Sequence, residues 1–153
     1  AALGSDHSGQ LGGGGSGGRS LVKLAKDYVG GDESGRLSDS DLRTRVIMNE
    51  IDGRAFQLTA MRAMAESKAN SGPSAATSIM KNAGTRWMQD RAELTIELMG
   101  HQGLGWEGDD FTAEELGAVR SWLGGKATTI YGGSQEGQNN IISKRILGLP
   151  DPK

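Results

Sequence analysis

The sequence contains no cysteine, and it has only two histidines among its 153 residues. The lack of thiols excludes a disulfide-stabilised scaffold, CxxC redox chemistry and thiolate metal sites. It also agrees with a reducing, cytoplasmic location. His7 and His101 are each isolated, so a histidine-based metal centre lacks ligands. We therefore expect no resident metal ion.

Strong charge of one sign and long apolar runs are also missing. The 17 basic and 19 acidic residues are interspersed and leave a net charge of −2. Nucleic-acid-binding proteins and polybasic membrane anchors usually carry a basic stripe, and this chain has none. No apolar run approaches the ~18 residues of a membrane span, and no secretory signal pattern opens the chain. We expect neither a nucleic-acid nor a membrane partner.

Glycine, in contrast, is abundant and is concentrated at the start of the chain. Of the 25 glycines, a dense cluster falls in residues 1–18, together with serine. Such a segment loses much backbone entropy on ordering, so we expect 1–19 to be flexible and 20–153 to form one domain. A native connection is favoured over an engineered linker. The chain does not begin with methionine, as is expected of a domain cut from a longer protein or of a processed product.

Apolar residues at spacings of three and four predict helices over most of the domain. Five segments share this spacing: 20–29, 38–70, 73–100, 112–130 and 134–148. Ser38 is the expected N-cap of the second segment, and Thr112 with Glu115 forms a capping box at the fourth. No strand-like alternation extends beyond a few residues. The prediction is an all-α fold, a four-helix up-and-down bundle with a short additional N-terminal helix.

The two long helices are expected to bury one apolar stripe each. The stripe of the second helix is predicted to contain Ile47, Ile51, Ala55, Leu58, Met61 and Ala65. The stripe of the third is predicted to contain Ala76, Met80, Ala83, Trp87, Leu94 and Leu98. Successive members lie three, four or seven positions apart, which places them on one side of a helix.

Three motif matches have simpler structural explanations. Residues 103–108 read GxGxxG, but a helix precedes them where a dinucleotide site needs a strand, so a loop is favoured. Ser78–Lys81 reads SxxK without the partner motifs of penicillin-recognising enzymes, so an exposed helix face is favoured. The acidic residues of 106–115 lack the spacing of an EF-hand, and a solvated helix start is favoured over calcium binding.

The most informative segment is Thr128–Pro150, which reads TTIYGGSQEGQNNIISKRILGLP. Gly132 and Gly133 form a turn that something can approach closely, and the helix after Ser134 presents N–H groups to an anion. The segment resembles the C-terminal motif of the acyl-CoA dehydrogenases, which often read T-I-Y-[E/G]-G-T-x-E-I-Q-x-N-I-I-A-x-x-x-L-G-L. With helix order, the resemblance covers roughly residues 20–150. Ser134 replaces the usual threonine and Gly137 the usual isoleucine.

The resemblance implies FAD as the cofactor and an acyl-CoA thioester as the substrate. Gly133 and Ser134 would lie against the flavin or its pyrophosphate, with Glu136 or Gln138 at the ADP portion. Tyr131 and Gly132 would face the substrate.

A second stretch, Glu97–Gly103, resembles the family's Q-x-x-G-G-x-G. That motif contacts the ADP part of an FAD bound to the neighbouring subunit. Glu97, Gly100 and His101 are therefore predicted cofactor contacts. Glu97 replaces the family's glutamine, and His101 replaces its second glycine. Without the resemblance, Gly100 is simply a helix C-cap.

No catalytic residue is assigned, because Gly132 occupies the position where many family members carry the glutamate base. Either the base lies upstream in a longer chain, or this is a non-catalytic subunit that supports a catalytic partner. The family also implies an electron-transfer flavoprotein as redox partner, a homo- or hetero-oligomer built on these helices, and further domains without which this chain is inactive. A helical assembly module and an acyl-CoA oxidase-like flavoprotein are the alternatives.

Overall fold

The computed structural model describes residues 20–70 and 76–150 of the chain. Five α-helices follow one another: α1 (Leu21–Tyr28), α2 (Ser40–Asn70), α3 (Ala76–Met99), α4 (Ala113–Gly125) and α5 (Gln135–Ile141). Short 3₁₀ segments follow α3 and α4 at Gly100–Leu104 and Lys126–Thr129, and a π-helical turn, Ile142–Ile146, follows α5. No strand occurs within these ranges, and the all-α prediction is confirmed. The segment predicted to be flexible, 1–19, lies outside the described residues.

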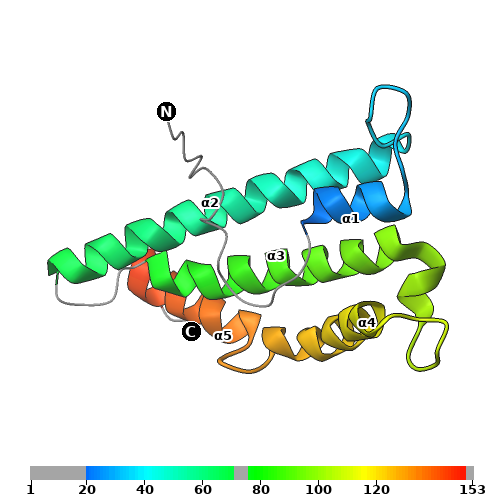
Figure 1. The fold of residues 1–153 in the computed structure, drawn as a ribbon. Helices are drawn as coiled ribbons and strands as arrows, with labels where there is room; N and C mark the ends of the chain where they lie inside the picture. Colours follow the sequence, from blue (N-terminus) through cyan, green and yellow to red (C-terminus); the bar gives the residue numbers. More distant parts are fainter. Residues whose placement is uncertain (1–19, 71–75, 151–153) are drawn as a thin grey trace, which may run out of the picture.

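Helix α3 is the central element of the domain (Figure 1). The long α2 runs antiparallel along one side of it, and α1 lies beside both helices near the C-terminal end of α3. On the other side, α4 and α5 follow one another along α3. Consequently α3 contacts every other helix and can position segments that are far apart in the sequence.

The apolar core lies at the end of the molecule where α1 covers α3. Its buried members come from α1, the following loop, the start of α2 and the end of α3: Leu21, Leu24, Ala25, Leu37, Val46, Leu94, Leu98 and Met99. The predicted burial of Leu94 and Leu98 is confirmed. In the same predicted stripe, Met80 and Trp87 are half-buried, whereas Ala83 is exposed. The side chain of Ala76 lies outside the described residues.

The start of α2 differs from the prediction. Asp39, rather than Ser38, caps the helix, because its carboxylate oxygen accepts hydrogen bonds from the N–H groups of Asp41 (2.9 Å) and Leu42 (3.0 Å). The helix begins at Ser40. Ser38 is therefore one residue too far from the first free N–H groups to satisfy them.

The predicted buried stripe of α2 is wrong for the described chain. All six of its members are exposed, with Ile47 at 52% and Ile51 at 53% exposure. The side that packs within the domain instead buries Val46, Asn49, Gly53 and Ala63. Apolar periodicity predicted burial of the more apolar face, because Asn49 and Gly53 on the packed face do not contribute to an apolar pattern. Helix α2 thus has an exposed apolar face in addition to its packed one.

Glycines and aromatic rings interlock where α2 meets α3. A β-carbon on Gly53 would lie 2.8 Å from the Trp87 ring, and one on Gly84 would lie 2.8 Å from the Phe56 ring. The two rings stack with centroids 5.8 Å apart. The Trp87 ring is also held by a hydrogen bond from its Nε1 to the Asn49 carbonyl (3.0 Å). Each helix therefore accepts a ring of the other at a residue without a side chain.

The predicted capping box at α4 is confirmed and extends into a wider network. The Glu115 N–H donates to Thr112 Oγ1 (3.2 Å), and the Thr112 N–H donates to the buried Glu115 carboxylate (2.7 Å). Tyr28 of α1 also donates its hydroxyl to Glu115 (2.7 Å). These hydrogen bonds, first that from the Thr112 N–H and then that from Tyr28, lower the pKa of Glu115. The carboxylate thus ties α1 to the start of α4.

Candidate cofactor and substrate site

The turn between α4 and α5 is open on its outer side. Gly132 and Gly133 have φ angles of +71° and +97°, a region that glycine adopts without steric cost. Ile130 and Tyr131, which precede them, are 72% and 63% exposed. The amide of Gln138 folds back and donates to the Gly132 carbonyl (3.2 Å). The chain thus presents an exposed aromatic residue and, at Gly132, backbone without a side chain at the position predicted for the substrate, while the Gln138 side chain lies against Gly133.

The start of α5 is partly capped by its own side chains. The Ser134 hydroxyl oxygen accepts from the Gly137 N–H (3.3 Å), so the predicted bare N-terminus keeps fewer free donors than expected. The Glu136 carboxyl accepts a hydrogen bond from its own N–H and a second from the Ser134 hydroxyl, and these bonds lower its pKa. Glu136 is therefore an exposed negative charge beside the turn.

Three polar side chains of α3 tether the segment that carries this turn. Lys81 Nζ donates to the Thr128 carbonyl (2.8 Å), and Asn82 Nδ2 donates to Asn139 Oδ1 (2.9 Å). Gln89 donates to the Gly125 carbonyl at the end of α4 (3.2 Å). Sequence analysis missed these tethers. The SxxK match did draw attention to Lys81, but a pattern of residues on one helix does not reveal which loop they meet.

The second predicted group lies at the other end of α3. The predicted cofactor contact Glu97 accepts hydrogen bonds from both terminal nitrogens of Arg45 on α2, at 2.7 and 2.5 Å. This pairing raises the pKa of Arg45. Gly100 has a φ of +56° and directly follows Met99, the last residue of α3, so the predicted helix end at this glycine is confirmed. The exposed His101 ring lies 6.3 Å from the Phe111 ring.

The glycines of the GxGxxG match have a packing role. A β-carbon on Gly103 would lie 2.5 Å from the Ile96 carbonyl oxygen, and one on Gly105 would lie 2.5 Å from the Phe111 ring. Both residues are buried, and α3 precedes them where a dinucleotide fold would have a strand. The loop interpretation of this motif is therefore supported by the contacts of its glycines.

The structure brings the predicted residues together as two separate sets. The first set belongs to the turn that lies beside Lys81 at Gly132, and the second set, Glu97, Gly100 and His101, lies where α3 ends at Met99. The two places are roughly 27 Å apart along the helix axis, at 1.5 Å per residue. One chain therefore cannot use both sets on the same part of a ligand.

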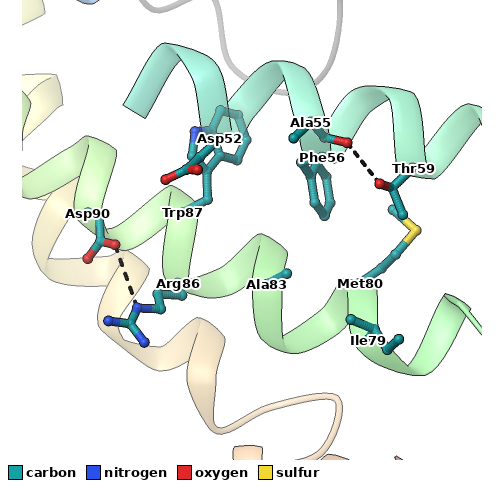
Figure 2. A pocket seen from close by; sticks show the side chains of 10 residues that line it. All are labelled: Asp52, Ala55, Phe56, Thr59, Ile79, Met80, Ala83, Arg86, Trp87 and Asp90. Carbon is teal, nitrogen blue, oxygen red and sulfur yellow. Dashed lines mark hydrogen bonds and ion pairs between the residues drawn. The ribbon is translucent and has the colours of Figure 1, made fainter. Parts of the chain in front are cut away.

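A groove between α2 and α3 lies outside both sets (Figure 2). Its cavity volume is about 360 Å³. Its apolar lining comes from Ala55, Phe56, Ile79, Met80, Ala83 and Trp87. Because none of the predicted site residues lines it, the groove is a packing feature of the helix pair rather than part of the candidate site.

The described residues form neither a metal site nor a membrane-spanning helix. Among the residues that the structure describes, no three of the His, Cys, Asp and Glu side chains gather as a metal site. No helix within the described ranges has the length and apolar character needed to cross a membrane.

Comparison with known proteins identifies the family. The model of the family described as "Acyl-CoA dehydrogenase, C-terminal domain" matches residues 11–147. The chain belongs to the acyl-CoA dehydrogenase family. It corresponds to the C-terminal helical domain of that family, as the order of its helices and the Tyr131–Ser134 turn predicted.

Two relatives carry the name "Acyl-CoA dehydrogenase IpdE1". The one from Mycolicibacterium smegmatis is 32% identical over 130 residues, which is 85% of this chain and 29% of the relative. The one from Mycobacterium tuberculosis is 36% identical over 72 residues, or 47% of this chain and 18% of the relative. The chain thus spans less than a third of the length of either protein.

A solved structure named "Tcur3481-Tcur3483 steroid ACAD" has a similar fold. The TM-score is 0.66 at 20% sequence identity, over 86% of this chain and 35% of that one. At this identity the likeness concerns the fold alone. It agrees with the all-α fold of this domain.

The turn of this acyl-CoA dehydrogenase domain has the properties that a flavin contact needs. Gly132 lacks the β-carbon that would keep a planar ring away from the backbone, and Tyr131 exposes an aromatic ring beside it, whereas the side chain of Gln138 lies 2.7 Å from where a β-carbon of Gly133 would be. The first N–H groups of α5 that Ser134 does not cap can donate hydrogen bonds. At the end of α3, Glu97 pairs with Arg45, which offsets part of its repulsion of a phosphate. The residues present therefore fit FAD.

Proposed function

We propose that this chain is the C-terminal domain of an FAD-dependent acyl-CoA dehydrogenase, and that it contributes FAD contacts and part of the oligomer core. The observation that carries the proposal is the exposed Tyr131–Ser134 turn, which α3 holds in place through Lys81 and Gln89. Family membership supports the reaction class, which is α,β-dehydrogenation of an acyl-CoA thioester.

Each residue of the turn has a proposed role. Gly133 and Ser134 contact the flavin or its pyrophosphate, and Glu136 lies at the ADP portion. Tyr131 and Gly132 border the substrate. When bound, FAD supplies the acceptor for the hydride that leaves the β-carbon of the thioester.

The α-proton must leave to a base outside the turn, because Gly132 has no side chain that can accept it. We propose a carboxylate outside residues 20–150 of the full-length protein as that base. At the other end of α3, Glu97, Gly100 and His101 contact the FAD of a neighbouring subunit. The separation of the two sets along α3 supports two different cofactors rather than one.

The exposed apolar face of α2 supports assembly into an oligomer. Its large members are Ile47, Met48, Ile51, Leu58, Met61 and Met64, and each is at least half exposed. Contiguous apolar surface of this kind usually marks an interface with another protein surface. We propose that it packs against another subunit, of the same or of a different chain. By family resemblance, electrons pass onward to an electron-transfer flavoprotein.

A second candidate is a subunit that abstracts no proton itself and supports a catalytic partner. Gly132 favours it, because glycine stands where many family members carry the base. The two candidates differ in one observable, which is whether the full-length chain reduces its own flavin. An acyl-CoA oxidase-like enzyme is distinguished by rapid reoxidation of its flavin by oxygen without an electron-transfer flavoprotein.

The test uses the full-length protein that contains this domain. We expect it to purify with FAD and its flavin absorbance to bleach when acyl-CoA thioesters are added without oxygen. A straight-chain and a steroid side-chain thioester are both included, because the name of the solved structure above contains "steroid ACAD". Flavin that bleaches only with a second subunit present supports the non-catalytic candidate. Full-length protein without flavin, alone or with such a subunit, contradicts the proposal.

A further inference from the structure

Lys81 lies directly beside the turn that carries the candidate site. Its Nζ donates to the Thr128 carbonyl at 2.8 Å. A β-carbon placed on Gly132 would lie 3.8 Å from Lys81 Cε. The space that a side chain at residue 132 would enter is therefore next to the Lys81 side chain.

No carboxylate of the described residues neutralises this ammonium. The ion pairs formed within residues 20–70 and 76–150 involve other lysines and arginines. The bond to Thr128 uses one of the three N–H groups of Lys81 and leaves two for a ligand or water. Lys81 is half-buried, and a charge in that situation favours an opposite charge over an apolar neighbour.

The other charged groups of α3, of α5 and of the Lys126–Thr129 segment already have partners. On α3, Arg86 pairs with Asp90, and Glu93 pairs with Lys126 of the 3₁₀ segment. On α5, Glu136 is held by the Ser134 hydroxyl and its own N–H. Lys81 differs from these groups, because the one hydrogen bond that it makes within residues 20–70 and 76–150 is to a neutral carbonyl.

We propose that Lys81 binds a carboxylate that residues 20–150 do not supply, at the substrate side of the Gly132 turn. This inference rests on the proposed function. The carboxylate comes either from the full-length protein, as the group that takes the α-proton, or from the acyl group of a dicarboxylic thioester. Both sources place a negative charge where the structure has an unneutralised ammonium next to a residue without a side chain.

The test compares three substitutions in the full-length holoenzyme. Lys81→Gln keeps an N–H donor for the Thr128 carbonyl and removes the charge, whereas Lys81→Arg keeps the charge. Lys126→Gln is the matched control, because Lys126 is a nearby lysine that Glu93 already neutralises. FAD content is measured for every variant before any other comparison.

Two measurements separate the two sources. The first is the pH dependence of kcat/KM with pentanoyl-CoA, in which a protein carboxylate beside Lys81 would titrate. The second is the preference for glutaryl-CoA over pentanoyl-CoA, measured as kcat/KM and as the ratio of dissociation constants in flavin-free protein. These two thioesters have the same number of acyl carbons and differ in the terminal carboxylate.

If the carboxylate belongs to the protein, Lys81→Gln raises its pKa, because the nearby positive charge is lost. The acid limb of the pH profile then moves to higher pH by about one unit or more. For a substrate carboxylate, Lys81→Gln lowers the preference for glutaryl-CoA by about tenfold. In either case Lys81→Arg restores the wild-type value and Lys126→Gln leaves it unchanged.

Three results would overturn the inference. In the first, Lys81→Gln changes neither the pH limb nor the preference, and Lys81 is then only a tether of the turn. In the second, Lys81→Gln loses flavin while Lys81→Arg keeps it, and the charge then acts on the cofactor. In the third, Lys126→Gln produces the same change. Failure of the proposed function is distinguishable, because wild-type protein would then neither hold flavin nor reduce it.

Discussion

The close approach of α2 and α3 at Gly53 allows a prediction in which two known effects oppose each other. Replacing a helix-interior glycine by alanine normally stabilises a helix by up to about 1 kcal/mol. At Gly53, however, the new β-carbon would lie 2.8 Å from Trp87 Cζ2 and 3.0 Å from its Nε1. The outcome depends on whether the Trp87 ring can move away.

The contacts of the Trp87 ring indicate that its displacement would cost free energy. Its Nε1 donates to the Asn49 carbonyl (3.0 Å), its ring stacks on Phe56, and the Arg91 guanidinium lies 6.0 Å from the ring centroid. Overpacking of this kind costs about 1–3 kcal/mol. This exceeds the gain in helix propensity, so we expect Gly53→Ala to destabilise the chain by about 1 kcal/mol net.

The matched control is Gly117→Ala in α4, where a β-carbon would meet nothing within 4 Å. This substitution should stabilise the chain by several tenths to about 1 kcal/mol. Gly84→Ala should fall between the two, because its β-carbon would meet the edge of the Phe56 ring beside the open groove of Figure 2. The measurement is urea unfolding followed by far-ultraviolet circular dichroism at one fixed protein concentration, because association also changes the midpoint.

The result that refutes this reasoning is a Gly53→Ala chain as stable as Gly117→Ala. A double substitution provides a further check. If the conflict is steric, Gly53→Ala should cost less in a Trp87→Leu background than in the wild type, and the two changes should not be additive.

Three further predictions concern other parts of the chain. The pKa of Glu115 is lowered in the folded state, so its hydrogen bonds stabilise the fold at pH values above the unfolded-state pKa of this carboxyl. This stabilisation is lost as the pH falls through the lower folded-state pKa. Tyr28→Phe should therefore cost about 1.5 kcal/mol of stability at neutral pH and less at pH 3, measured by urea midpoints. Ile51→Glu or Leu58→Glu should weaken self-association while helicity is kept, and an unchanged sedimentation profile would contradict the proposed interface. In the full-length protein, Gly132→Glu should create measurable flavin bleaching if no other base exists, and should leave the activity unchanged or lower it if one does. In both cases the φ of +71° at this residue adds roughly 1 kcal/mol of backbone strain.

The sequence by itself determined the helices and the family. Local signals decide such features: apolar spacing predicts α3, Thr112 and Glu115 predict the capping box, and Gly100 predicts a helix end. The Tyr131–Ser134 turn could be identified as the candidate site because its glycines and the hydroxyl of Ser134 are contiguous in the chain. The roles of these residues toward FAD remain predictions.

Only the tertiary structure decided which face of α2 packs within the domain and what holds the candidate turn in place. The packed face of α2 contains Asn49 and Gly53. These two residues are buried there because they fit the Trp87 ring of α3, and not because they are hydrophobic. In the same way, Lys81 and Thr128 are 47 positions apart, and neither residue type indicates the other. Periodicity reports how apolar each side of one helix is, whereas packing depends on the shape and polar groups of the partner that the fold brings against it.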